Sequence, residues 1–207
     1  MKDKLGGLYA ITDKKLVARE NFAEAVEKAI RGGASVIQLR EKETPESEII
    51  TLGKELLSVT KSYGVPLIIN DSPEITKKIG AEGVHLGEGD CSIEHAREVL
   101  GTGAIIGVSC YGSIERGLDA ERRGADYAAF GTPYSTPTKP GRVPTPIEVL
   151  VQAKKGIKSI PIFAIGGIFP ENARVILDTG VDGIAAITSI FGTDDHEQAA
   201  RELSSIL

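Results

Sequence analysis

Charged and amide side chains alternate in the segment Gln38–Lys42, which reads Gln-Leu-Arg-Glu-Lys directly after an apolar run. If the chain is extended there, alternate side chains share a face, so Gln38, Arg40 and Lys42 point the same way. An amide and two cations on one face can bind an anion such as a phosphate group. The segment could instead be a solvated charged loop. We favour the binding interpretation because Arg40 closes a strand that is expected to be buried.

Two aspartates follow other apolar runs. Asp71 comes directly after Asn70 at the end of one run, and Asp90 follows the run that contains His85. Two carboxylates near cations that bind phosphate suit Mg²⁺, which takes one or two carboxylates together with water and phosphate oxygens. Each aspartate also has a structural interpretation, as the cap of the helix that follows it. The pairing of the two favours a magnesium site.

Polar residues and glycines also follow the later apolar runs. Ser109 ends one run, and a longer loop carries Thr136-Pro137-Thr138-Lys139, whose hydroxyls and charge could meet an anionic ligand or simply belong to a Pro-rich flexible loop. Gly166-Gly167 and Ile187-Thr188-Ser189 end the last two runs. Glycine lets a ligand approach the backbone closely, so these ends predict a site for one phosphate monoester. His85 either fills the core or lines the pocket, and we assign it no role as a general base.

Eight short apolar runs rich in Val and Ile are each followed by a stretch with helical spacing of apolar residues, which is typical of repeated parallel βα units. The expected strands are Leu8–Thr12, Ser35–Arg40, Pro66–Asp71, Gly83–Gly87, Ile105–Ser109, Asp126–Gly131, Pro161–Gly166 and Gly183–Thr188. The expected helices are Phe22–Arg31, Pro45–Ser62, Pro73–Ile79, Ile93–Leu100, Ile114–Arg123, Pro146–Lys155, Pro170–Asp178 and His196–Leu207. Thr44 and Ser72 each place a capping hydroxyl before a proline.

Eight alternations without a linker predict a single (β/α)8 TIM barrel, one domain over residues 1–207. An open, doubly wound sheet is the rival, but it usually has fewer strands. In the barrel, the loops after the strands carry the chemistry, and the polar residues proposed above for binding lie at the end of an expected strand or in the loop after it. The sequence therefore predicts that these residues converge on one rim.

Composition is that of an ordinary globular protein, with 41% hydrophobic residues and a net charge of −5 over 207 residues. Phosphate-backbone binding needs clustered Lys and Arg across a basic face, so we expect no nucleic-acid partner. The sequence has no leader-like start and no apolar stretch of membrane-spanning length, so we expect no membrane partner. The cysteines Cys91 and Cys110 match no metal or redox spacing, which favours a reducing cytoplasm.

Several motifs, taken together, resemble those of the thiamine-phosphate synthase (thiamine-phosphate pyrophosphorylase) family, and the resemblance covers essentially the whole chain. The motifs are Tyr9-Ala10-Ile11-Thr12, Gln38-Leu39-Arg40-Glu41-Lys42, Asn70-Asp71, Gly83-Val84-His85-Leu86-Gly87 with Asp90, Gly107-Val108-Ser109, Thr136-Pro137-Thr138-Lys139 and Ala164-Ile165-Gly166-Gly167-Ile168. The resemblance implies a Mg²⁺-dependent transferase that joins a pyrimidine diphosphate, 4-amino-2-methyl-5-hydroxymethylpyrimidine diphosphate, to thiazole phosphate. The products are thiamine phosphate and pyrophosphate.

The resemblance also implies roles for individual residues. Asp71 and Asp90 would hold Mg²⁺, and Gln38 and Ser109 would face the pyrimidine. The other substrate-binding positions are Leu39, Arg40, Glu41, Lys42, Asn70, Thr136, Pro137, Thr138, Lys139, Gly167, Ile187 and Thr188. The diphosphate would be held by four of them, Arg40, Lys42, Asn70 and Lys139. The same four residues would act in catalysis together with Ser109. The thiazole phosphate would be bound by Thr136, Thr138, Gly167, Ile187 and Thr188.

Three features depart from the family's pattern: Ser72 stands where a second acidic residue is common, Thr132-Pro133-Tyr134 replaces a Gly-Pro-hydrophobe turn, and the loop Pro140–Pro144 is individual. One alternative is a thiazole tautomerase on the same barrel. That branch of the family looks to use a histidine near the end of the sixth strand, where this chain has Thr132. A second alternative is a non-catalytic sensor of a phosphate ligand, which would have no need of two magnesium-binding carboxylates. A homo-oligomer is compatible with the sequence.

Overall fold

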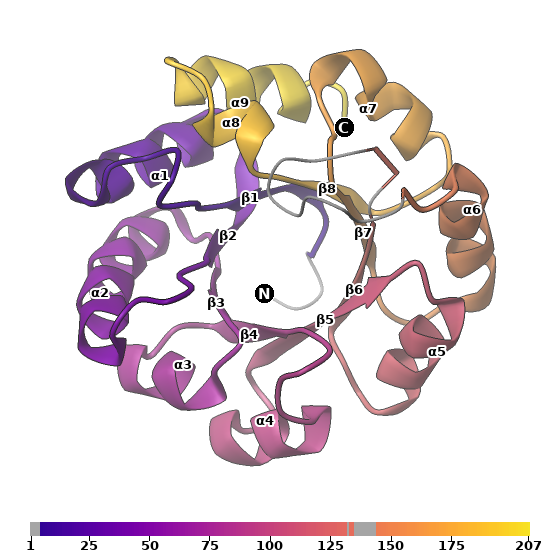
Figure 1. The fold of residues 1–207 in the computed structure, drawn as a ribbon, viewed down its shortest axis with the longest axis horizontal. Helices are drawn as coiled ribbons and strands as arrows, with labels where there is room; N and C mark the ends of the chain where they lie inside the picture. Colours follow the sequence, from indigo (N-terminus) through magenta and orange to yellow (C-terminus); the bar gives the residue numbers. More distant parts are fainter. Residues whose placement is uncertain (1–4, 132, 135–143) are drawn as a thin grey trace.

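The computed structural model describes residues 5–131, 133–134 and 144–207. Eight parallel strands form a closed barrel in which each strand pairs with the next along the chain and β8 pairs with β1 (Figure 1). Helices surround the barrel on the outside (Figure 1). The predicted (β/α)8 barrel is therefore confirmed, and the open doubly wound sheet is excluded because the strand order closes on itself.

The elements alternate regularly along the chain. The strands are β1 Gly7–Ile11, β2 Ala34–Leu39, β3 Leu67–Asn70, β4 Gly83–Leu86, β5 Ile105–Tyr111, β6 Tyr127–Phe130, β7 Ile162–Ile165 and β8 Gly183–Ala186. The helices are η2 Arg19–Asn21, α1 Phe22–Arg31, α2 Glu46–Tyr63, α3 Pro73–Ile79, α4 Ile93–Leu100, α5 Ile114–Arg122, α6 Ile147–Gly156, α7 Pro170–Leu177, α8 Thr188–Phe191 and α9 His196–Ser204. None of the described helices is both long and apolar enough to cross a membrane.

The helix boundaries follow from local chemistry. Ser72 caps α3 by accepting a hydrogen bond from the Ile75 N–H at 3.2 Å, with Pro73 in the first turn, as the sequence predicted. Gly80 ends the same helix in the left-handed conformation, with a φ of 79° that favours glycine. The expected cap at Thr44 is wrong. Helix α2 begins one residue later than expected, because the Thr44 hydroxyl donates to Glu41 at 2.6 Å instead.

Two separate layers of apolar side chains hold the barrel together. The larger layer lies between the strands and the surrounding helices and includes Leu39 and Phe130. The smaller one fills the inside of the barrel, where Tyr9, Tyr127 and Phe163 pack edge to face with ring centroids 5.3 to 5.8 Å apart. The barrel interior is therefore a packed floor, and the cavity described below lies above it.

Two local features differ from the expected elements. Strand β5 runs on to Tyr111 through an irregularity in its register with β6, and Tyr111 adopts a positive φ of 54°. Strand β8 ends at Ala186, and Thr188 begins the short helix α8 instead of ending the strand. A single turn of helix has too few apolar positions to produce a periodic pattern, so α8 could not be predicted from apolar spacing.

Candidate active site

A cavity of about 330 Å³ lies at the carboxyl ends of the strands. It is lined by residues of the loops after β2, β3, β4, β7 and β8, and by side chains from inside the barrel. Among the residues predicted from the sequence, the lining includes Gln38, Arg40, Lys42, Asn70, Asp71, Asp90, Ser109, Gly167, Ile187 and Thr188. Residues from distant parts of the chain thus converge on one rim, as the pattern of strand ends predicted.

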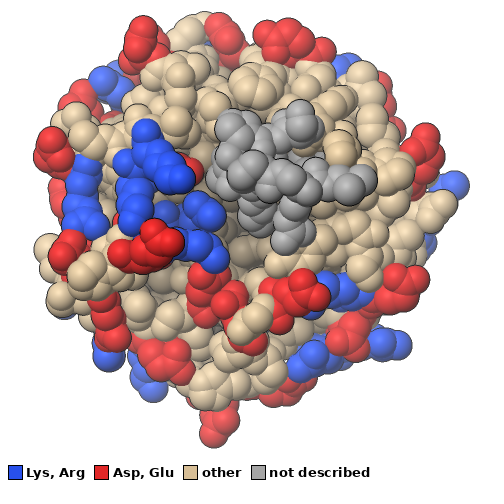
Figure 2. All heavy atoms as spheres, in the orientation of Figure 1, with Lys and Arg blue, Asp and Glu red and all other residues tan. Residues whose placement is uncertain are grey.

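One wall of the cavity, formed by the ends of β2 and β3, carries the positive charge. The alternation of side chains along β2 turns Gln38, Arg40 and Lys42 into the cavity, as expected for an extended segment. The side chain of Arg40 is 19% exposed and lies 3.9 Å from the Asp13 carboxylate. Nζ of Lys42 lies 3.3 Å from Oδ2 of Asp71. Figure 2 shows Lys and Arg gathered on this face, on the side of α1 and α2 and beside a hollow in the surface.

The two aspartates lie next to each other on this side of the cavity. Burial raises the pKa of Asp71, the neighbouring Asp90 carboxylate raises it further, and Lys42 acts in the opposite direction. Asp71 also adopts a positive φ of 70°, a conformation that is uncommon outside glycine and that Asp tolerates better than most residues. Two half-buried carboxylates in contact repel each other unless a proton or a cation lies between them. This pair therefore fits a divalent cation.

The structural interpretation of these aspartates, as helix caps, is wrong. Ser72 caps α3, and Ser92 caps α4 by accepting from the His95 N–H at 3.2 Å. Oδ2 of Asp90 instead accepts from the Gly87 N–H at 2.6 Å, within the loop between β4 and α4. Among the described residues, no group of three or more His, Cys, Asp and Glu side chains is arranged to hold a metal. Two carboxylates alone suit Mg²⁺, which commonly completes its shell with water and phosphate oxygens.

The amide of Asn70 is the remaining polar group on this wall. Its Nδ2 atom is buried and has no hydrogen-bond partner in the part of the chain that the structure describes. An unpaired buried donor is costly unless a ligand satisfies it. Because Asn70 lines the cavity next to Asp71, its amide is suited to donate to an oxygen of a bound anion.

The opposite wall, after β7 and β8, carries no charged side chain among the described residues that line the cavity. Gly166 and Gly167 have φ angles of 110° and 65°, which favour glycine and bring the bare backbone to the cavity surface. Asn172 fixes this turn, because its Nδ2 donates to the Gly167 carbonyl and its Oδ1 accepts from the Phe169 N–H, both at 2.9 Å. Thr188 adds a hydroxyl from the start of α8. Backbone groups and a hydroxyl can bind a phosphate monoester here.

Comparisons with known proteins show the family to which this chain belongs. A model of the thiamine monophosphate synthase family matches residues 8–190. The chain belongs to the thiamine monophosphate synthase family. Thiamine-phosphate synthase of Methylococcus capsulatus is 46% identical over 97% of this chain and 88% of its own length. The corresponding synthase of Clostridium novyi is 43% identical over 96% of this chain and 97% of its own length.

A solved structure supports the same assignment. Thiamine phosphate pyrophosphorylase from Pyrococcus furiosus is 40% identical to this chain and superimposes with a TM-score of 0.89, covering 99% of this chain and 96% of that one. The resemblance inferred from the motifs is therefore confirmed at the level of the thiamine monophosphate synthase family, whose members named above are transferases.

Some residues predicted from the family's motifs do not line the cavity. Leu39 is 1% exposed and packs in the layer between strands and helices. Glu41 points away from the cavity, accepts from Thr44, and lies 3.7 Å from Arg19. Both positions follow from alternation along the strand, which turns neighbours of Arg40 outward. Their predicted contact with substrate stays a prediction. The predicted residues Thr136, Pro137, Thr138 and Lys139 lie outside the described residues.

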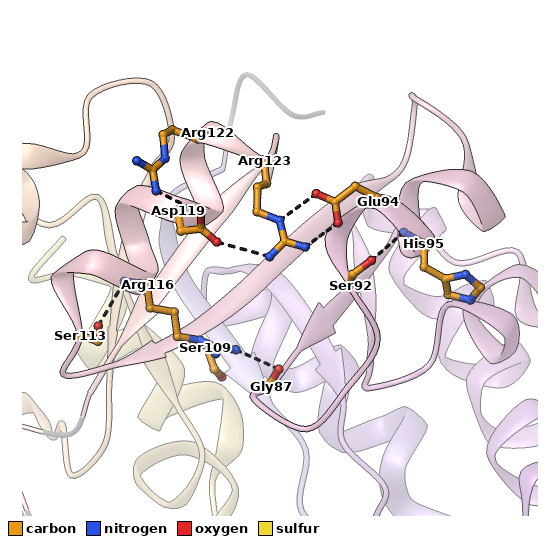
Figure 3. Close-up of polar contacts among 10 residues, drawn as sticks. All are labelled: Gly87, Ser92, Glu94, His95, Ser109, Ser113, Arg116, Asp119, Arg122 and Arg123. Atoms are coloured by element: carbon orange, nitrogen blue, oxygen red, sulfur yellow. Dashed lines mark hydrogen bonds and ion pairs between the residues drawn. The ribbon is translucent and has the colours of Figure 1, made fainter.

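Sequence reasoning missed Arg116 on α5. Its Nε donates to the Ser109 carbonyl at 2.6 Å and its Nη2 donates to the Gly87 carbonyl at 3.0 Å (Figure 3). The guanidinium therefore ties the end of β5 to the loop that carries Asp90. No sequence pattern marks such a residue, because an arginine in a helix is usually a surface charge.

Proposed function

We propose that this chain joins 4-amino-2-methyl-5-hydroxymethylpyrimidine diphosphate to thiazole phosphate, giving thiamine phosphate and pyrophosphate. The carbon–oxygen bond to the diphosphate breaks, its electron pair leaves with pyrophosphate, and the thiazole nitrogen bonds to the pyrimidine methylene carbon. The observation that carries this proposal is a cavity whose described lining has one charged wall and, across from it, a glycine wall without charged side chains. Such a cavity suits a diphosphate and a monophosphate that meet across it.

The charged wall would bind the diphosphate. Arg40 and Lys42 supply positive charge, and the unpaired Nδ2 of Asn70 supplies a donor for a phosphate oxygen. Asp71 and Asp90 would hold Mg²⁺, which when bound would neutralise charge on the departing pyrophosphate. The proposed leaving group would thus lie beside Arg40 and Lys42, and stabilising the charge that develops there would be the main electrostatic task.

The floor of the cavity would hold the pyrimidine ring. Gln38 and Ser109 line the cavity above the aromatic side chains that fill the barrel. The proposed reaction needs no side-chain nucleophile, because the leaving group departs early and the amino group of the ring stabilises the cation that forms on the methylene. The task of these residues is to hold the ring in line with the thiazole nitrogen.

The uncharged wall would receive the thiazole phosphate, through the backbone at Gly167 and Ile187 and the hydroxyl of Thr188. For the segment outside the described residues the proposal rests on the family's motif alone. There, Thr136 and Thr138 would contact the thiazole phosphate, and Lys139 would contact the diphosphate.

The experiment is a coupled assay with the purified protein, Mg²⁺ and both substrates. We expect thiamine phosphate and pyrophosphate in equal amounts, and we expect chelation of the metal by EDTA to abolish turnover, with recovery when Mg²⁺ is added back. Tautomerisation of a thiazole phosphate without coupling would favour the tautomerase alternative. Binding of one phosphate compound without any turnover would favour the sensor and would contradict the proposal.

A further inference from the structure

Gln38 and Ser109 are joined beneath the cavity by a continuous chain of hydrogen bonds. Nε2 of Gln38 lies 2.7 Å from Oη of Tyr9, and the two phenol oxygens of Tyr9 and Tyr127 lie 2.8 Å apart. Oη of Tyr127 lies 2.9 Å from Nδ1 of His85, and Nε2 of His85 lies 2.8 Å from Oγ of Ser109. The chain crosses the inside of the barrel and reaches the cavity at both ends.

The middle of this chain is sealed from water. Tyr9 is 1% exposed and Tyr127 is fully buried. Burial raises the pKa of both phenols above the ordinary value of tyrosine, so both carry their protons at neutral pH. The ring of Tyr127 occupies the space above Gly107, where a Cβ atom would collide with it, and stacks on His85 with centroids 5.6 Å apart. The network is therefore held in one arrangement by packing.

The identity of each group sets the direction of the chain. The amide nitrogen of Gln38 only donates, so the Tyr9 hydroxyl accepts a hydrogen bond from it. The Tyr9 hydroxyl then donates its own hydrogen bond to Tyr127, which is the other partner of Tyr9 among the described residues. Tyr127 then donates to Nδ1 of His85, which leaves the imidazole proton on Nε2 and directs it to Ser109. The hydroxyl proton of Ser109 is left to point into the cavity.

We propose that Tyr127 is a positioning residue that acts through His85 to fix the hydrogen-bonding pattern of the cavity floor. In this pattern the Gln38 carbonyl accepts and the Ser109 hydroxyl donates. The pattern matches one edge of a 4-aminopyrimidine, where the amino group donates and the adjacent ring nitrogen accepts. A 4-oxopyrimidine has the reverse pattern, with an acceptor at C4 and a protonated ring nitrogen. The inference rests on the proposed function in its choice of ligand.

The direction of the chain can be tested without any substrate. An amide of Gln38 turned end for end would reverse every bond and move the proton of His85 to Nδ1, so the tautomer reports the direction. The measurement is ¹⁵N NMR of the imidazole in the intact protein, with His85→Gln used to assign the signal among the three histidines. We expect the proton on Nε2. A proton on Nδ1 would overturn the proposal.

Removal of the Tyr127 hydroxyl provides the second part of the test. Tyr127→Phe keeps the ring and its packing but removes the hydroxyl that donates to Nδ1 of His85, so we expect a mixture of the two His85 tautomers. Tyr63→Phe is the matched control, because the Tyr63 hydroxyl is exposed and pairs with Glu27 away from the cavity. An unchanged tautomer in Tyr127→Phe, at a melting temperature close to that of the wild type, would contradict the proposal.

The third measurement is the selectivity of binding between the two pyrimidine diphosphates. Their affinities are measured by calorimetry without thiazole phosphate, so that the coupling reaction cannot take place. We expect the wild type to bind the 4-amino diphosphate about 100-fold more tightly than its 4-oxo analogue, since a mismatched edge leaves buried polar groups unpaired. In Tyr127→Phe we expect this ratio to fall about tenfold, through tighter binding of the analogue as Ser109 becomes free to accept. Tyr63→Phe should keep the wild-type ratio.

The outcomes separate this inference from the proposed function. If the wild type forms no thiamine phosphate, the proposed reaction fails, yet the tautomer measurement still decides the direction of the chain. If the wild type is active and Tyr127→Phe keeps both the tautomer and the binding ratio, the inference fails while the proposed reaction stands.

Discussion

The two walls of the cavity present phosphate-binding groups of different kinds. The wall after β2 and β3 presents the side-chain charges of Arg40, Lys42 and Asp71, whereas the wall after β7 and β8 presents the backbone of Gly167 and a hydroxyl from Thr188. In the proposed reaction the diphosphate gains charge as it leaves, but the monophosphate keeps the same charge throughout. On the proposed function, the charged groups would lie where charge develops, and the neutral groups where a ligand is only held.

The largest effect should come from the carboxylates of the charged wall. We expect Asp71→Asn and Asp90→Asn each to lower kcat about 1,000-fold, because each would remove a ligand of the proposed Mg²⁺, whose positive charge would stabilise the leaving group in the transition state. Steady-state kinetics over a range of Mg²⁺ concentrations measures this. Asp119→Asn is the control, since Asp119 pairs with Arg122 and Arg123 on the surface of α5. Full activity in either cavity variant would remove that aspartate from the proposed metal site.

The next effect should come from the cation at the end of β2. We expect Arg40→Gln to lower kcat/KM for the pyrimidine diphosphate roughly 30-fold, because a charge-assisted hydrogen bond to the diphosphate is lost. KM for thiazole phosphate should change little. Arg31→Gln, which alters an exposed arginine paired with Glu197, is the matched control. Equal losses for both substrates would show that the two walls do not act separately.

A substitution in the uncharged wall should change KM for thiazole phosphate and leave kcat nearly unchanged. We expect Thr188→Val to raise KM for thiazole phosphate about fivefold with kcat nearly unchanged, since a neutral hydrogen bond to a group of constant charge stabilises ground and transition states alike. Thr179→Val, at the end of α7 and outside the cavity, is the control. A fall in kcat with no change in KM would contradict the contrast between the two walls.

The smallest effect should come from Arg116, which acts on the Asp90 loop through the backbone carbonyls of Gly87 and Ser109. Arg116→Lys can satisfy one of the two carbonyls, at Gly87 or Ser109, but not both. We expect a loss of kcat of about threefold, together with a weaker apparent affinity for Mg²⁺, because a displacement of the Asp90 loop misaligns its ligand. Arg123→Lys, whose arginine pairs with Glu94 beside it on the surface (Figure 3), is the control. A metal affinity equal to that of the control would limit Arg116 to a structural role.

Much of this arrangement could be predicted from the sequence, because its signals are local. Apolar periodicity gave each of the eight strands to within one or two residues at either end. Alternation along β2 placed Gln38, Arg40 and Lys42 on one face, and the closed barrel then brought them to the same rim as Asp71 and Asp90. These steps need only the period of a strand and the geometry of a barrel.

The features that were not predicted depend on contacts between distant residues. The interaction of Arg116 with Gly87 and the meeting of Tyr9 and Tyr127 both depend on side-chain directions that a sequence pattern does not specify. The sequence alone could not decide whether the two aspartates cap helices or line a binding site, because aspartate and serine are both common N-cap residues. The structure excludes the capping role, since Ser72 and Ser92 cap the two helices.

The fit between Gly107 and Tyr127 has a consequence for how such a barrel can change over generations. A methyl group at Gly107 would collide with the phenol ring of Tyr127 on the neighbouring strand, so Gly107 can be substituted only where position 127 no longer carries that ring. A lineage that acquires a different ring preference through Tyr127 would therefore first gain freedom at Gly107, and the pair should covary among descendants. If Tyr127 acts as proposed, substrate choice and the packing of the barrel would be inherited as one trait.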